Sequence, residues 1–204
     1  MLTTLKNGRQ TVTADTRGAE LQTIDKDGGP SYLWSGDPAF WAFHAPTLFP
    51  IIGALRGGRA LSAGGEISLP KHGFCRTAEF ALEDAGDTFV TYRLTDSDAT
   101  RKGYPFAFCL RVRYTLEGDS VETRYTVTNR SEQDMPFFIG GHPAFRVPLS
   151  EGETLEDYLD KNIFAEAKSE TAEPDEADMQ GFEKFLERYK ATLPVEKSAV
   201  ETLK

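Results

Sequence analysis

The stretch LRVRYTLEGDSVETRYTVT, residues 110–128, decides the fold class of this chain. On both sides of residues 117–120, apolar and polar residues alternate with a period of two, which is typical of a strand with one buried face. The Glu-Gly-Asp-Ser run between the two halves supplies residue types that favour a tight hairpin turn. The stretch therefore predicts two antiparallel strands joined by a hairpin.

Most of the first 150 residues have the same character. Residues 79–83 and 88–94 form a second predicted antiparallel pair around a turn at 84–87. Short strands separated by turn residues at this spacing are typical of a sandwich or barrel, and no strong helical pattern interrupts them. The sequence therefore predicts an all-β fold, an antiparallel β-sandwich, for residues 1–158.

Residues 159–204 differ in composition and are predicted to be an acidic linker followed by an amphipathic helix. Residues 165–178 are rich in Glu, Ala, Ser and Asp, which is typical of a solvated linker or weak helix. From Asp178, a candidate N-cap, apolar residues recur at helical spacing. They are Met179, Phe182, Leu186 and Tyr189. Pro194 is expected to interrupt this helix before a second, short one over residues 195–204. We expect the apolar stripe to dock on its own domain or on a partner.

The charge of the chain limits its partners. The net charge is −9, which argues against nucleic acid or an anionic membrane as the main partner. Residues 151–204 hold 15 acidic and 7 basic groups, so the first 150 residues are close to neutral. Residues 1–18 are polar, without the apolar segment of a secretory signal, and we expect a cytoplasmic protein. In that setting Cys75 and Cys109 are expected to be free thiols rather than a bridge or a metal site.

Two histidines stand in motifs suited to acid–base work. His142 lies in GGHPAF, residues 140–145, after an apolar run over 135–139. The glycines allow close approach of a ligand, and Pro143 disfavours helical geometry at His142. His72 lies in a second motif, KHGF, residues 71–74. Imidazoles exchange protons near neutral pH. The alternative for each is a partly buried histidine that a backbone group satisfies.

Five motifs in order carry a resemblance to a known family. They are GDPAFW (36–41), HAPTLFPIIG (44–53), KHGFCR (71–76), YPFAF (104–108) and GGHPAF (140–145). With them the chain resembles the aldose 1-epimerase, or galactose mutarotase-like, family over about residues 1–158, and the similarity then stops. The resemblance implies a large two-sheet sandwich, incomplete here, and a carbohydrate-active isomerase that interconverts the α and β anomers of a free aldohexose. It implies no metal and no organic cofactor.

The resemblance also implies roles for particular residues. His142 matches the histidine that protonates the ring oxygen, and His72 the one that binds the sugar near that oxygen. Many relatives carry a sugar-binding arginine where this chain has Ala54, so Arg56 or Arg59 is a candidate replacement; the alternative is a solvated loop cation. Arg76 is a further candidate for binding sugar hydroxyls, with a surface salt bridge as the alternative. Phe145, next to the His142 motif, is expected to contact the sugar.

The largest departure from the family lies after residue 158. The family's catalytic carboxylate comes late in the chain, and no matching glutamate motif is present here, so we expect the catalytic base to be missing. The alternatives to an impaired isomerase are a non-catalytic sugar-binding β-sandwich and an inactive, truncated gene product. A phosphosugar epimerase is less favoured, because no basic cluster suits a phosphate. A homodimer through the C-terminal helix or an exposed sheet edge is a further expectation.

Overall fold

The computed structural model describes residues 1–147, 149, 152–168 and 170–202. It divides into two compact units, Met1–Tyr158 and Leu159–Lys204, which are described separately.

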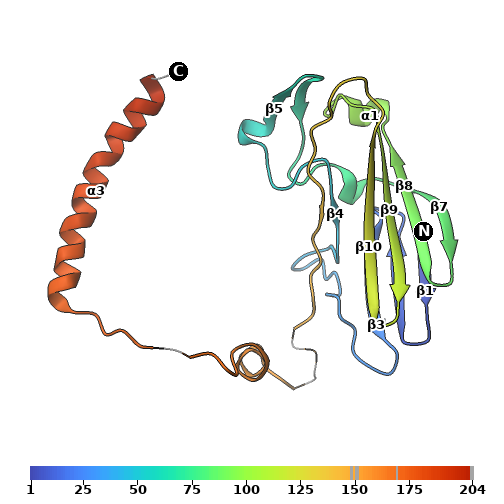
Figure 1. Cartoon of the computed structure of the whole chain (residues 1–204), viewed down its shortest axis with the longest axis horizontal. Coiled ribbons are helices and arrows are strands. Elements are labelled where there is room, and N and C mark those ends of the chain that lie inside the picture. The colour runs from blue at the N-terminus through green and yellow to red at the C-terminus, as the bar shows by residue number, and fades with distance from the viewer. Residues whose placement is uncertain (148, 150–151, 169, 203–204) are drawn as a thin grey trace. The chain divides into compact units, whose positions relative to one another are not determined.

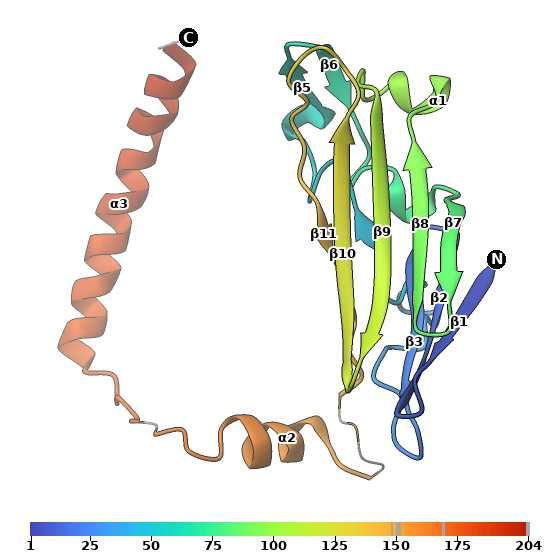
Figure 2. The same cartoon turned by 45° about the vertical axis from the view of Figure 1, so that its right-hand side comes forward.

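The first unit is built on two antiparallel sheets (Figures 1 and 2). The three-stranded sheet has the order β1-β2-β3, with β1 Leu2–Lys6, β2 Gln10–Asp15 and β3 Glu20–Lys26. The four-stranded sheet has the order β10-β9-β8-β7, with β7 Ala81–Gly86, β8 Phe89–Thr95, β9 Phe108–Glu117 and β10 Ser120–Asn129. Two short pairs complete it: β4 Thr47–Leu48 with β11 Gly140–Gly141, and β5 Arg59–Ser62 with β6 Gly65–Ser68.

The helices of this unit are single turns. They are η1 Arg56–Gly58, η2 Cys75–Thr77, α1 Asp98–Arg101 and α2 Leu155–Tyr158. Because these helices are so short and the sheets form the rest of the regular structure, the unit has the all-β fold that the sequence predicts.

The hairpin that decides the fold class is confirmed. Glu117 of β9 faces Ser120 of β10, so only Gly118 and Asp119 form the turn. Gly118 has a φ of 58°, which a glycine adopts without strain. The second predicted pair is confirmed as β7 and β8, with bounds a few residues later than expected for β7.

The two sheets share one core. Alternate residues of β9 point inward and are buried: Phe108, Leu110, Val112, Tyr114 and Leu116. Two buried tyrosines then tie this sheet to the other layer, since the hydroxyl of Tyr92 donates to the carbonyl of Ala14 at 3.0 Å. The hydroxyl of Tyr114 donates to the carbonyl of Ala19 at 2.6 Å. The period-two pattern of the sequence thus becomes a two-layer sandwich with a hydrogen-bonded aromatic core.

Beside this core, a second aromatic cluster gathers around Phe49. Its ring lies 5.3 to 6.2 Å from those of Phe74, Tyr104 and Phe108. The carbonyl of Phe49 accepts the backbone N–H of Phe74 at 3.2 Å, and Gly73 forms a β-bridge with Phe49. The KHGF turn is therefore fixed directly on the segment that contains β4.

The described residues of the second unit begin with a π-helical turn, Leu159–Ile163, and contain one long helix, α3, Glu176–Thr202. Asp175 caps α3, because its carboxylate accepts the N–H groups of Ala177 and Asp178 at 2.9 and 3.1 Å. The prediction of Asp178 as N-cap is therefore wrong by three residues.

The expected break at Pro194 is also wrong, since Pro194 lies inside α3. A proline removes one intrahelical hydrogen bond, and helix-favouring residues such as Ala191, Glu196 and Lys197 flank it on both sides. The packing of the apolar stripe stays a prediction.

Two further expectations concern the thiols and the membrane. Cys75 and Cys109 are free and buried, as predicted, and burial raises the pKa of the Cys75 thiol well above its ordinary value. Among the helices of the described residues, none has the length and apolar character needed to cross a membrane.

The contact of Gly73 with Phe49 predicts a specific loss of stability. A Cβ at Gly73 would overlap the carbonyl oxygen of Phe49, and Gly73 has a φ of 72°. Gly73→Ala should therefore lower the melting temperature more than Gly8→Ala. Gly8 has a similar φ of 77° with nothing near its Cβ position, so that variant carries only the backbone strain of about 1–2 kcal/mol. Equal losses, measured by thermal unfolding, would contradict the assigned contact.

Candidate functional site

His72 and His142 lie side by side, although they are 70 residues apart in sequence. Their ring centroids are 6.0 Å apart with an interplanar angle of 74°. The pairing of β11 with β4 brings the GGHPAF segment to residues 46–48. The N–H of His142 then donates to the carbonyl of Pro46 at 3.1 Å. Backbone pairing thus places His142 beside the turn that carries His72.

The backbone and ring of His72 are held by one residue, Gly53. The His72 N–H donates to the Gly53 carbonyl at 2.7 Å, and the Gly53 N–H donates to Nδ1 of His72 at 3.1 Å. His72 has a φ of 70°, a conformation that is uncommon for a residue with a side chain. Because Nδ1 accepts a hydrogen bond, the neutral ring carries its proton on Nε2.

The surroundings of His72 favour its neutral form. Partial burial lowers the pKa of His72 below its ordinary value, and the nearby cations of Lys71 and Arg76 lower it further, as does His142. A neutral imidazole with Nδ1 occupied offers Nε2–H as a hydrogen-bond donor. At neutral pH this ring is therefore suited to donating to a ligand oxygen.

The two histidines line a small cavity of about 160 Å³. Its other lining residues are Trp41, Pro46, Leu48, Lys71 and Arg76. The Trp41 ring lies 5.3 Å from that of His142, and the guanidinium of Arg76 lies 5.3 Å from the ring of Phe43. The cavity thus combines an aromatic wall, two imidazoles and two cations. Among the described residues, no carboxylate lines it.

The predicted site residues do not all meet in this cavity. Arg76 lines it together with the two histidines. Arg56 is an exposed residue of η1 and is absent from the lining, and Arg59 lies 3.6 Å from Glu66 in an ion pair. His44 also lies outside, where its Nε2 contacts the carbonyl of Ser35 at 3.1 Å.

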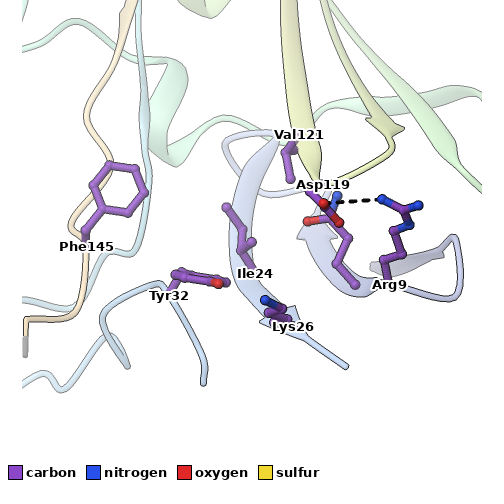
Figure 3. Close-up of a pocket in the computed structure, with 8 residues that line it drawn as sticks. Arg9, Ile24, Lys26, Tyr32, Asp119, Val121 and Phe145 are labelled. Atoms are coloured by element: carbon purple, nitrogen blue, oxygen red, sulfur yellow. Dashed lines mark hydrogen bonds and ion pairs between the residues drawn. The ribbon is translucent and has the colours of Figure 1, made fainter. Parts of the chain in front are cut away.

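Phe145 lines a different and larger hollow of about 500 Å³ (Figure 3). The other residues of that hollow are Arg9, Gln10, Ile24, Lys26, Tyr32, Asp119 and Val121. It contains no histidine, and Arg9 is paired with Asp119 at 3.2 Å. The smaller cavity holds both imidazoles, so we take it as the candidate site.

Sequence reasoning did not select Lys71 or Trp41, which both line the candidate site. Lys71 directly precedes His72, and Trp41 ends the GDPAFW motif. Both signals were visible, but aromatic residues of a β-sandwich are more often core than ligand contacts. The approach of residues 41 and 142 depends on the β4–β11 pairing, which two-residue strands do not reveal in the sequence.

Comparison with known proteins assigns the class. The family model for aldose 1-epimerase matches residues 1–181, so the chain belongs to the aldose 1-epimerase family. The match extends beyond residue 158, where we expected the resemblance to stop.

Individual relatives support the same assignment. The plasmid-encoded protein LacX of Lactococcus lactis is 43% identical over 160 residues, which are 76% of this chain and 54% of that protein. A solved galactose mutarotase related enzyme from Lactobacillus acidophilus has a TM-score of 0.72 at 36% identity and covers 76% of this chain and 52% of that one. A galactose mutarotase-like protein from Lactobacillus casei has a TM-score of 0.69 at 37% identity, covering 74% and 52%. The chain therefore spans about half the length of these relatives.

The environment of His72 predicts its titration. Its pKa should lie below the ordinary 6.5, and Arg76→Gln should raise it, because one of the cations that disfavour the charged ring is removed. Long-range ¹H–¹⁵N correlation spectra followed against pH measure both the pKa and the Nε2–H tautomer. Thr77→Gln, an exposed change on the same turn, is the control and should leave the pKa in place. A protonated Nδ1 in the neutral ring would contradict the hydrogen bond from Gly53.

Proposed function

We propose that the chain binds an aldose sugar in the cavity between His72 and His142. One observation carries this proposal: two imidazoles from distant segments face one cavity at a centroid distance of 6.0 Å. Membership of the aldose 1-epimerase family supports a sugar as the ligand. The tilted ring of Trp41 beside His142 adds an apolar surface on which a sugar face can lie.

The chemistry that we propose is ring opening and closure at the anomeric carbon. A base removes the proton from the anomeric hydroxyl while an acid protonates the ring oxygen, and the bond between the anomeric carbon and the ring oxygen breaks. Rotation of the open aldehyde and the reverse steps give the other anomer. His142 is exposed, and its motif matches the family histidine that protonates the ring oxygen, so we assign it the acid role. His72 donates from Nε2 to a neighbouring sugar oxygen.

The described lining of the cavity offers no evident base for this reaction. No carboxylate lines the cavity in the described residues, and a positioned acid or base contributes about 10²–10⁴-fold to rate. We therefore propose an impaired isomerase, slow by about that factor. A sugar-binding protein without activity is the alternative, and it requires the same cavity.

A second candidate ligand is a sugar phosphate. Lys71 and Arg76 both line the cavity, and neither joins an ion pair within the part of the chain that the structure describes. Paired cations of this kind suit a phosphate. A Salmonella typhimurium protein provisionally named glucose-6-phosphate 1-epimerase is 31% identical over 109 residues, 49% of this chain. The sequence did not predict this basic pair. A preference for the phosphorylated sugar that Arg76→Gln removes would favour this candidate.

Polarimetry tests the proposal directly. Freshly dissolved α-glucose or α-galactose should change its rotation only slightly faster with the protein than without it, and His142→Ala should remove that difference. His44→Gln, a histidine outside the cavity, is the matched control and should leave the rate unchanged. A strongly accelerated change of rotation that depends on His142 would contradict the proposal that the site lacks a catalytic base. Binding that survives both His72→Ala and His142→Ala would contradict the site.

A further inference from the structure

Within the described residues of the first unit, the four-stranded sheet ends in a long strand, β10, whose outer edge pairs with no other strand. β10 has ten residues, and β9 is its only partner among the described residues of the first unit. Two contacts fix which residues of β10 bond to β9. Ser120 lies opposite Glu117 across the two-residue turn, and the N–H of Arg130 donates to the carbonyl of Ala107 at 2.8 Å. Even-numbered residues of β10 therefore point their backbone groups at β9, because hydrogen-bonded pairs alternate. The odd-numbered residues 121–129 point theirs at the open edge.

The core is incompletely covered along this edge. Val112 and Leu116 of β9 are buried, whereas their partners Tyr125 and Val121 in β10 are only half-buried. The 500 Å³ hollow opens at the same place, between Val121 of β10 and Ile24 of β3 (Figure 3). A strand added beside β10 would place its inward side chains at this hollow.

β10 carries few of the features that block edge pairing. Its sequence, SVETRYTVTN, contains no proline and no lysine, and its pairing with β9 shows no bulge. The paired strands β2–β3 and β7–β8, by contrast, each have a register shift. A long, regular edge of this kind is a template for another strand. The first 150 residues carry 17 acidic and 16 basic groups, so charge repulsion between two copies of the sandwich is weak.

We propose that β10 pairs antiparallel with β10 of a second copy, with the two-fold axis at Thr123. Only odd-numbered residues of β10 offer backbone groups to a new strand, so odd-numbered residues of the two copies must lie opposite each other. This condition holds only when the two-fold axis passes through the position of a residue and not between two residues. An axis at Glu122 or at Arg124 would place like charges opposite each other. An axis at Thr123 places Glu122 opposite the second copy's Arg124, twice by symmetry. An axis at Tyr125 would place Glu122 and Arg124 opposite uncharged residues of the second copy.

The same register suits the inner face. Val121 lies opposite the second copy's Tyr125, which brings an aromatic ring to the mouth of the hollow beside Val121. Thr123 lies opposite Thr123 of the second copy, and threonine pairs of this kind are favourable across strands. Glu122 and Arg124 already contact each other at 3.0 Å within one strand and are exposed. The dimer therefore joins two such contacts into one four-charge cluster.

Charge reversal tests the register, because two variants that each fail to dimerise should dimerise with each other only if residues 122 and 124 of different copies face each other. Sedimentation of the full chain over a dilution series should show a dimer. Glu122→Arg and Arg124→Glu, each alone, should weaken self-association about 10-fold or more, because like charges then face each other. An equimolar mixture of the two variants should dimerise again, because their charges are complementary. Lys102→Glu, at an exposed cation outside the strand, should have no effect.

Cross-linking tests the axis independently. Thr123→Cys should form a disulfide-linked dimer on mild oxidation, since antiparallel partners lie about 5.5 Å apart at Cα. Thr126→Cys, on the same strand but opposite Ser120, should not. A wild-type chain that stays monomeric at the highest concentration would overturn the proposal. A dimer that Glu122→Arg and Arg124→Glu leave unchanged but Phe182→Ser abolishes would also overturn the β10 proposal. That result would assign the interface to α3.

Discussion

The close approach of Gly73 to the carbonyl of Phe49 is the constraint on which the candidate site depends. It fixes the KHGF turn on one side of the segment that contains β4. The same segment pairs with β11 on its other side, which brings in the GGHPAF turn. Residues 47–49 therefore hold both histidine turns. The spacing of the imidazoles follows from backbone contacts, and the rings of Phe74, Tyr104 and Phe108 pack around Phe49 beside them.

Elements with strong local patterns could be predicted from the sequence. The β9–β10 hairpin follows from alternation and a two-residue turn, and the sandwich follows from several such pairs. The start of α3 was misplaced because Asp175 and Asp178 are equally good caps by residue type, and only the hydrogen bonds distinguish them. Pro194 misled the prediction because a helix tolerates one lost bond when its neighbours favour helix.

The meeting of His72 and His142 in one cavity could be predicted only through family resemblance. Nothing in the spacing of His72 and His142 brings them together, since their meeting depends on long-range strand pairing. Phe145 follows His142 by three residues, and in an extended segment that offset places side chains on opposite faces. It lines the larger hollow for this reason, whereas Lys71 and Trp41 reach the cavity. Neighbourhood in the sequence would have found Lys71, next to His72, but it misplaced Phe145.

We propose that His72 and His142 form one sugar-binding cavity, and a ligand titration followed on the imidazole NMR signals tests whether both rings meet the same ligand. Titration with glucose and with glucose 6-phosphate should shift the signals of both histidines with a single shared dissociation constant. The signals of His44, which lies outside the cavity, should stay in place. Different constants for His72 and His142, or shifts at His44 alone, would show that the two histidines do not share one sugar-binding cavity.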